Sequence, residues 1–259
     1  MDRFAQSRVD RFAQSRVDRF AMTGVDSARE EGSFVLDKRV SSLAAAVAGI
    51  EDGAVILVGG FGSSGIPVEL THALLDAGPR ELTLVTNNAG SGERDVAALL
   101  RERRVRKIVC SYPRSRGSVW FEKLYRAGEV ELELVPQGTL SERMRAAAAG
   151  LGGFFTPTGA DSRLAEGKEV REIGGRLHVF EEPLPGDVAL VKADRADRWG
   201  NLTYHSAARN FGPTMAAAAA LTVVQVREIV ELGSLDPECV VTPGIFVNRV
   251  VEVPDAVPA

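Results

Sequence analysis

The sequence predicts an α/β protein with an open, mostly parallel sheet flanked by helices and a smaller β-rich portion. Residues 54–58 (AVILV) form a short continuous apolar run, which is typical of a strand buried on both faces, and residues 82–86 (LTLVT) are predicted to be a second buried strand. Longer segments of helical periodicity separate these runs, and strands joined by helices form parallel sheets through right-handed crossovers. A glycine-rich turn, residues 59–65, connects the first such strand to its helix.

The elements follow one another regularly through the first half of the chain. A serine at position 41 can cap the first helix, and Pro67 and Gly78 mark the start and end of the second. In order, we expect helix 41–50, strand 54–58, helix 67–77, strand 82–86, helix 96–103, strand 107–111, helix 119–127, strand 131–135 and helix 140–149.

The pattern changes after Gly150. Residues 152–155, 176–180 and 188–193 are predicted to be short strands between turns, either in a smaller β-rich half or in a long excursion from the sheet. A helix over residues 215–220 and a strand over 222–226 follow. Because no linker rich in Ser, Gly and Pro divides the chain, we expect residues 36–253 to form one two-lobed domain.

The first 26 residues differ from the rest. Residues 2–9 read DRFAQSRV, residues 10–17 repeat them, and residues 18–25 are a degraded copy. This eight-residue period fits neither a heptad nor the common solenoid repeats. We interpret residues 1–26 as a disordered extension that arose from a duplicated coding segment or from a start placed upstream of Met22. A weakly helical docking arm is the alternative.

Composition excludes several classes of function. The 259 residues include 31 Lys and Arg against 35 Asp and Glu, a net charge of −4, whereas proteins that bind nucleic acid usually carry a basic excess. Cys110 and Cys239 cannot form a disulfide framework. No apolar run approaches the ~18 residues of a membrane span. We therefore expect a cytoplasmic protein without a nucleic-acid or membrane partner.

The glycine-rich turn is the strongest chemical signal. Its glycines allow a sharp turn and a close approach of a ligand to the main chain. The N-terminus of the following helix, near Pro67, offers free N–H groups to a phosphate or an oxyanion. The candidate binding residues are Gly59, Gly60, Phe61, Gly62, Ser63, Ser64 and Gly65.

Two other interpretations of the turn exist. Residues 60–65 satisfy G-x-G-x-x-G, the dinucleotide-binding fingerprint, but that site also needs an acidic residue at the end of the next strand. Here that strand is followed by Asn87 and Asn88. A tight turn without any ligand is the second alternative.

Amide side chains gather at the same predicted edge of the sheet. Asn87 and Asn88 follow the second strand, and Gln137 follows strand 131–135. Such neutral groups can orient a carboxylate or polarise a thioester carbonyl without acting as nucleophiles. We predict that these three residues line a cleft, the alternative being that they only cap turns.

Other reactive residues point to no site. His72, His178 and His205 lack the spacing of metal ligands, so no metal site is expected. Cys110 lies within a predicted buried strand and is interpreted as an inert apolar residue. No Asp or Glu stands in a setting that marks a nucleophile or general base. We therefore expect no catalytic residue in this chain and a reacting group supplied by another chain.

Several segments taken together resemble a known family. In order they are GGFGSSGIP, NNAGSGE, VRKIVCSYPR, VELELVPQGTLSERMRAA, FFTPTG, REIGGR, DRWGNLTYHSAARNFGP and TPGIFVNRVV. They resemble the A (alpha) subunit of family I 3-oxoacid CoA-transferases over Leu36–Val253. The segments NNAGSGE, RWGNLTY and TPGIFVNRV are most similar to the 3-oxoadipate branch, which serves aromatic catabolism through the β-ketoadipate pathway. His205 departs from the Arg or Lys expected in relatives.

The resemblance implies an open α/β fold and an active site shared with a B subunit, in a heterodimer or heterotetramer. It implies CoA transfer from succinyl-CoA to a 3-oxoacid through a glutamyl-CoA thioester on the B subunit. CoA is then a substrate bound at Gly59–Gly65, with no permanently bound cofactor. Acetoacetate- and acetate-type transferases are the alternatives within the family. An NAD-dependent oxidoreductase and a non-enzymatic small-molecule-binding module are the alternatives outside it.

Overall fold

The computed structural model describes residues 36–114 and 117–254, and the repeat of residues 1–26 lies outside them. The main sheet has eight strands in the order β11-β10-β8-β1-β2-β3-β4, with β9 paired to β8. Its strands are β1 (Val55–Val58), β2 (Leu82–Asn88), β3 (Val105–Tyr112), β4 (Glu131–Leu134), β8 (Gly186–Asp197), β9 (Leu202–Thr203), β10 (Ala219–Val230) and β11 (Arg249–Glu252).

Neighbouring strands along this order are parallel, and only the short β9 runs antiparallel to β8. The helices are α2 (Leu43–Val47), α3 (Val68–Ala77), α4 (Val96–Arg101), α5 (Val119–Arg126), α6 (Gln137–Ala149) and α7 (Gly212–Ala218), with 3-10 turns η1 (Arg163–Ala165), η2 (Ser206–Arg209), η3 (Pro237–Cys239) and η4 (Gly244–Phe246). The open parallel sheet flanked by helices confirms the predicted fold class. None of these helices combines the length and the apolar character that a membrane crossing needs.

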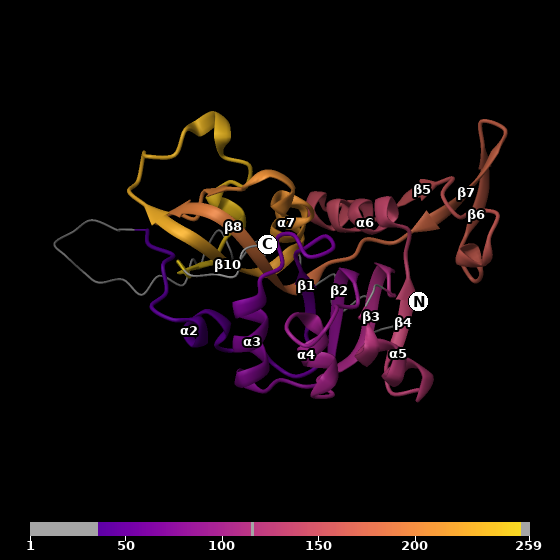
Figure 1. The fold of residues 1–259 in the computed structure, drawn as a ribbon. Coiled ribbons are helices and arrows are strands. Elements are labelled where there is room, and N and C mark those ends of the chain that lie inside the picture. Colours follow the sequence, from indigo (N-terminus) through magenta and orange to yellow (C-terminus); the bar gives the residue numbers. More distant parts are fainter. Residues whose placement is uncertain (1–35, 115–116, 255–259) are drawn as a thin grey trace.

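Two layers of helices cover the sheet, with α3, α4 and α5 below it and α6 and α7 above it (Figure 1). Successive strand residues point to opposite faces. In β1, Ile56 and Val58 accordingly pack into the core between the sheet and α2–α5. Val55 and Leu57 pack into the core between the sheet and α6 and α7. Burial on both faces is the reason why β1 is apolar throughout.

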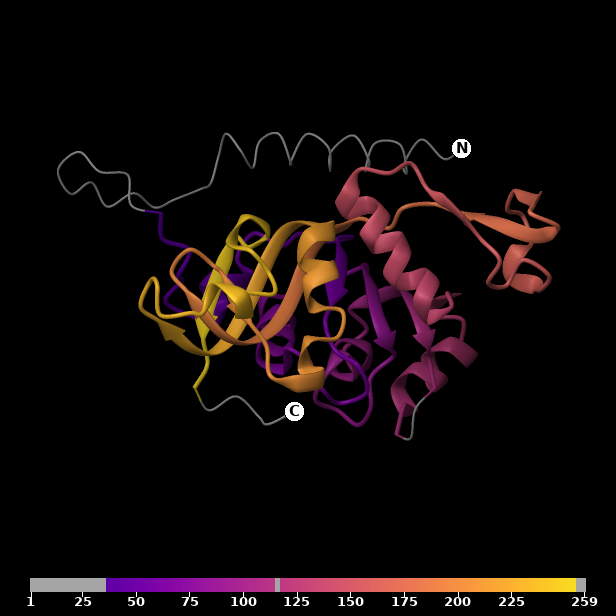
Figure 2. The ribbon, with the colours of Figure 1, turned by 90° about the horizontal axis from the view of Figure 1, so that it is seen from above.

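The region after residue 150 differs from the prediction. Strands β5 (Phe154–Thr156), β6 (Val170–Ile173) and β7 (Arg176–Glu181) form a separate antiparallel sheet in the order β5-β7-β6. It projects from the body as an arm (Figures 1 and 2). Residues 188–193 belong to a strand, as predicted, but the prediction that this strand is short and part of the β-rich portion was wrong. They lie within β8, which pairs with β1 and β10 at the centre of the main sheet, so the arm is an excursion from which the chain returns.

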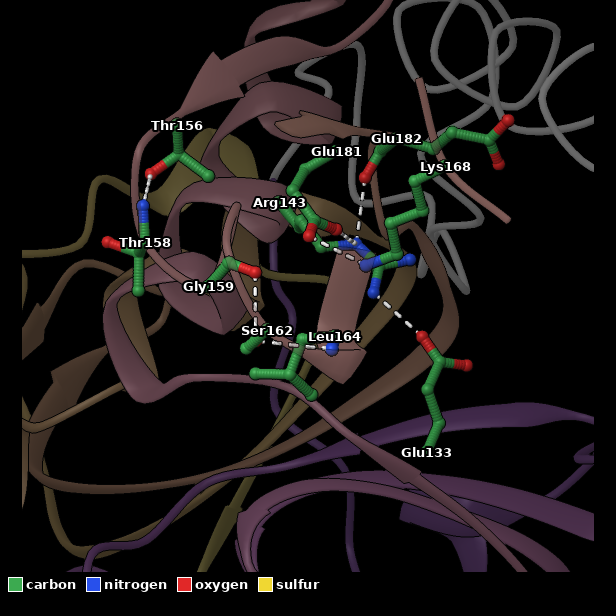
Figure 3. Close-up of polar contacts among 10 residues, drawn as sticks. All are labelled: Glu133, Arg143, Thr156, Thr158, Gly159, Ser162, Leu164, Lys168, Glu181 and Glu182. Atoms are coloured by element: carbon green, nitrogen blue, oxygen red, sulfur yellow. Dashed lines mark hydrogen bonds and ion pairs between the residues drawn. The ribbon is translucent and has the colours of Figure 1, made fainter. Parts of the chain in front are cut away.

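A chain of ion pairs joins the arm to the body. Glu133 on β4 accepts from Lys107 on β3 (2.6 Å) and from Arg143 on α6 (2.8 Å). Glu181, which is buried on β7, contacts Arg143 (3.8 Å) and Lys168 (2.7 Å). Figure 3 shows Arg143 between the two carboxylates, with its Nε also donating to the carbonyl oxygen of Glu182 (2.8 Å). Arg143 therefore links α6 to the arm and to the edge of the sheet.

This arrangement predicts a pH-dependent contribution to stability. Burial of Glu133 disfavours its charged form, but the charge and hydrogen bond of Arg143 and the contact with Lys107 outweigh burial and lower its pKa to about 2. Its contribution is therefore present above the ordinary pKa of about 4.5 and disappears as the pH falls through about 2. We expect Glu133→Gln to lose about 1 kcal/mol at pH 7, since partial exposure screens such pairs.

Urea unfolding between pH 7 and pH 2 measures this effect. The difference between wild type and Glu133→Gln should shrink toward the acid end. Glu142→Gln is the control, because Glu142 pairs with Arg145 on the exposed surface of the same helix (2.7 Å). A difference that is independent of pH, or equal to that of the control, would contradict the assignment.

Candidate functional site

The glycine turn closes on itself at the carboxyl end of β1. The amide of Phe61 donates to the carbonyl of Ser64, and the amide of Ser64 donates back to the carbonyl of Phe61, both at 3.0 Å. Gly62 lies at the tip with a φ of +61°, a conformation that favours glycine. The tip residues Phe61, Gly62 and Ser63 are exposed, whereas Gly59, Gly60 and Gly65 at the base are buried. The turn therefore presents its tip to solvent from a fixed base.

The base of the turn has no room for side chains. A Cβ at Gly65 would lie 2.4 Å from the carbonyl oxygen of Ala208, and one at Gly60 would lie 2.6 Å from Cγ1 of Ile66. Both glycines also have positive φ, at +70° and +131° respectively. Glycine is required here by the close approach of neighbouring backbone and by the conformation itself.

Asn88 lies beside the turn. Its Nδ2 donates to the carbonyl of Gly62 (3.3 Å), and its Oδ1 accepts from the amide of Gly90 (2.9 Å). A small pocket opens between the turn, the end of β2 and the start of α4, lined by Val58, Gly59, Gly60, Ile66, Thr86, Asn88, Asp95 and Val96. The structure thus brings Asn88 and the base of the glycine turn into one pocket.

Asn87 points elsewhere. The sequence suggested that both asparagines follow the strand, but they are the last two residues of β2 and therefore face opposite sides of the sheet. The Nδ2 of Asn87 donates to Oγ of Ser111 on β3 (2.9 Å), and Ser111 Oγ donates to the carbonyl of Asn87 (3.1 Å). Asn87 therefore ties β2 to β3 and is not among the pocket residues.

Gln137 is also separate from the pocket. It is the exposed first residue of α6 and follows β4 at the edge of the sheet. Strands β2 and β3 lie between β4 and β1, and three inter-strand spacings amount to about 14 Å. Any ligand that contacts both Gln137 and the turn must span that distance, so the role of Gln137 in a cleft stays a prediction.

The N-terminus of α3 is partly occupied by the protein itself. The amide of Leu70 donates to Oε1 of Gln225 (3.1 Å), a residue of β10 that is fully buried. Gln225 also contacts the carboxylate of Glu69 in the first turn of the helix. A negative charge at this position opposes a bound anion, so the structure does not support the prediction that the helix start shares in anion binding. By contrast, the amides of Gly62 and Ser63 have no hydrogen-bond partner among residues 36–114 and 117–254.

The carboxylate that lines the pocket has a structural role. Asp95 caps α4: its carboxylate accepts from the amide of Ala97 (2.9 Å) and from the amide of Ser91 (3.2 Å). These bonds fix the loop that follows β2 against the start of the helix. Asp95 is therefore engaged by backbone donors and is not presented as a nucleophile.

Two further side chains were considered in the sequence analysis, and a third was given no role there. Cys110 is fully buried, as predicted, and burial raises the pKa of its thiol to about 12, which makes it unreactive. His205 is exposed at the start of η2. Sequence reasoning missed Asn210, which contacts the glycine turn from a distant part of the chain at Gly60 and Ser64. An Asn just before Phe-Gly-Pro was the only local signal, and spacing gave it no role.

An open parallel sheet with a glycine turn and a pocket at the carboxyl ends of its central strands is the arrangement in which α/β proteins place their ligand sites. A family model described as "Coenzyme A transferase" matches residues 40–253. The chain belongs to the coenzyme A transferase family, which confirms the resemblance seen in its motifs and the prediction of a CoA-transferase enzyme.

Known relatives agree with this assignment. The chain is 58% identical over 222 residues to the A subunit of 3-oxoadipate CoA-transferase from Pseudomonas putida, with 86% of this chain and 96% of that protein covered. It is 45% identical over 216 residues to the A subunit of a probable succinyl-CoA:3-ketoacid coenzyme A transferase from Bacillus subtilis, covering 83% and 90%.

A solved structure shows the same fold. An acyl-CoA transferase from E. coli O157:H7, crystallised as a thioester complex with CoA, superimposes with a TM-score of 0.74 at 22% identity. The match covers 85% of this chain and 48% of that one, so this chain spans about half the length of that solved enzyme.

The geometry of the turn predicts a difference between two of its glycines. Gly65→Ala forces a side chain against a backbone carbonyl, whereas the Cβ of Gly62→Ala meets nothing within 4 Å. We expect Gly62→Ala to lose about 1 kcal/mol through conformational strain alone. Gly65→Ala should lose about 2–3 kcal/mol through strain and displacement of η2. Urea unfolding of the two variants measures this, and equal losses would contradict the described packing.

Proposed function

We propose that this chain is the A subunit of a CoA-transferase that moves CoA from succinyl-CoA to 3-oxoadipate and acts with a separate B subunit. The observation that carries the proposal is the 58% identity to a relative named as the A subunit of 3-oxoadipate CoA-transferase, over 96% of that relative's length. At that similarity the pocket and the turn are expected to be retained, and both are present here.

The glycine turn is the proposed contact with the CoA thioester. The amides of Gly62 and Ser63 find no hydrogen-bond partner within the described residues and lie at the exposed tip. Backbone N–H groups fixed in advance stabilise negative charge as it develops on a carbonyl oxygen. Asn88 holds the carbonyl of Gly62 from the pocket side (3.3 Å), which favours one orientation of the tip.

The reacting carboxylate is proposed to come from the B subunit. Asp95 is engaged by the amides of Ser91 and Ala97, and Glu69 by Gln225, so the acidic groups around the turn have structural partners. The solved acyl-CoA transferase is about twice as long as the part matched here, which leaves room in that protein for a second half. A separate B subunit would supply the corresponding half.

The proposed chemistry proceeds in two balanced halves. A glutamate carboxylate supplied by the B subunit first attacks the thioester carbonyl of succinyl-CoA, and the C–S bond breaks to give an acyl anhydride and the CoA thiolate. The thiolate then attacks the glutamyl carbonyl, which releases succinate and leaves a glutamyl-CoA thioester. The 3-oxoacid carboxylate reverses these steps and leaves with CoA. Anhydride and thioester are both hydrolysed by water, so a cleft closed between two subunits protects them.

A second acceptor class has specific support. The relative from Bacillus subtilis, 45% identical, is named for a 3-ketoacid rather than for 3-oxoadipate. The two acceptor classes differ in charge, because 3-oxoadipate carries a second carboxylate that acetoacetate, the simplest 3-oxoacid, lacks. An assay with both acceptors therefore distinguishes the two classes.

Transfer activity tests the proposed function. The chain co-produced with its B subunit should transfer CoA from succinyl-CoA to 3-oxoadipate, with a kcat/KM at least about tenfold above that for acetoacetate, equivalent to about 1.4 kcal/mol. Formation of the acyl-CoA product is followed by chromatography. Equal or reversed preference would assign the protein to the 3-ketoacid class, and transfer by this chain alone would contradict the shared site.

Covalent labelling locates the reacting carboxylate. When the complex is incubated with succinyl-CoA without an acceptor, intact-mass spectrometry should show a CoA adduct on the partner chain and none on this chain. Asp95→Asn serves as a control in this chain, since it retains one acceptor oxygen for the amides it caps and should leave labelling of the partner intact. An adduct on this chain would overturn the proposal.

A further inference from the structure

Asn210 joins the glycine turn to a segment that lies far along the chain. Its Oδ1 accepts from the amide of Gly60 (3.0 Å), and its Nδ2 donates to the carbonyl of Ser64 (3.1 Å). Gly60 directly precedes the closed Phe61–Ser64 pair, and Ser64 is the last residue of that pair. One side chain therefore holds both ends of the turn at a fixed separation.

The same side chain is anchored in its own segment. Its Oδ1 also accepts from the amide of Phe211 (2.7 Å), and its Nδ2 also lies within hydrogen-bond distance of the carbonyls of Ala207 (3.2 Å) and Ala208 (3.0 Å). Ala208 also packs against the glycine turn, because its carbonyl oxygen lies where a Cβ at Gly65 would have to be. The turn thus rests on η2 through Asn210 and Ala208 together.

The backbone at Asn210 is itself unusual. Its φ of 23° and ψ of −116° fall in a region that residues other than glycine rarely adopt. Such a conformation costs free energy and persists where the surroundings over-determine it. Here the hydrogen bonds of the Asn210 side chain with Gly60 and Ser64 stabilise the unusual backbone conformation, which directs the amide group toward the turn.

A glycine turn needs such support to act as a preformed donor site. Glycines lose more conformational freedom on ordering than other residues, so an unsupported turn would be ordered only when the ligand binds, at the expense of affinity. We propose that Asn210 is a positioning residue that holds the glycine turn in the shape that receives the CoA thioester. This rests on the proposed function of the turn.

Asn210→Gly is the variant that tests this role, since glycine accepts the observed backbone conformation and removes only the side-chain hydrogen bonds. In the complex with the B subunit, the concentration of succinyl-CoA that half-saturates formation of the enzyme thioester should rise about tenfold. The limiting rate should change less. Hydrogen exchange of the peptide that contains Gly60–Ser64 should become faster.

Asn248→Gly is the matched control. Asn248 is also half-buried, and its Oδ1 accepts from a backbone amide, that of Thr222 in β10 (2.8 Å), rather than from the turn. It should leave succinyl-CoA saturation unchanged, whatever its effect on the thermal midpoint. Asn210→Asp is the second variant, because it keeps the acceptor for Gly60 and places a carboxylate oxygen against the carbonyl of Ser64. It should weaken saturation at least as much as Asn210→Gly.

The outcomes separate the two proposals. If the wild-type complex forms no thioester, the proposed function fails. If the wild type forms the thioester while Asn210→Gly saturates like the wild type, or changes no more than Asn248→Gly, Asn210 has no positioning role. Faster exchange of the turn without a change in saturation also overturns the inference, and unchanged exchange shows that Asn210 does not hold the turn.

Discussion

The candidate site depends on the fixation of one glycine turn by segments that are distant in sequence. β1 delivers the turn to the carboxyl edge of the sheet, where the amide of Gly59 donates to the carbonyl of Leu190 on β8 (3.0 Å). Asn88 on β2 holds the tip, and Asn210 holds the two ends. Because glycine has so little conformational preference of its own, the shape of the turn is a property of the tertiary structure.

The central position of β1 makes this fixation possible. The strand lies between β2 and β8, and its side chains enter both hydrophobic cores, so its end moves only if the whole sheet moves. The arm of β5, β7 and β6 lies beyond the edge strand β4 and is tied to the body through Arg143. The strand that carries the turn is thus held by packing on both faces, while Arg143 ties the arm to the body through polar contacts.

Local pattern predicted most elements of the first half, because burial on both faces leaves a direct mark in residues 54–58 and 82–86. It also predicted a strand at residues 188–193 but not its place in the main sheet, because the pairing of β8 with β1 depends on strand order and not on neighbouring residues. The alanines at 219 and 220 favour helix by propensity, yet they begin β10, where pairing with β8 overrides that preference.

The strand end at Asn87 and Asn88 was placed two residues early, which concealed that the two side chains face opposite ways. Asn210 was beyond reach, because its partners lie at Gly60 and Ser64 and no periodicity connects them.

The chemistry proposed for the turn agrees with the absence of a cation from its residues. The start of α3 carries the acidic residue Glu69, and residues 59–66 include no Lys or Arg. The tip of the turn therefore offers backbone amides and no cationic side chain. In a CoA transfer of the kind proposed, one carboxylate and one thioester become another carboxylate and another thioester, so the net charge of the reacting groups stays the same. A fixed cation at the turn would stabilise the carboxylate that is present before the reaction and the carboxylate that is present after it. Such uniform binding does not lower the barrier. Amide donors aimed at a carbonyl oxygen interact most strongly when that oxygen becomes negative, so a neutral, rigid turn favours the transition state over either carboxylate.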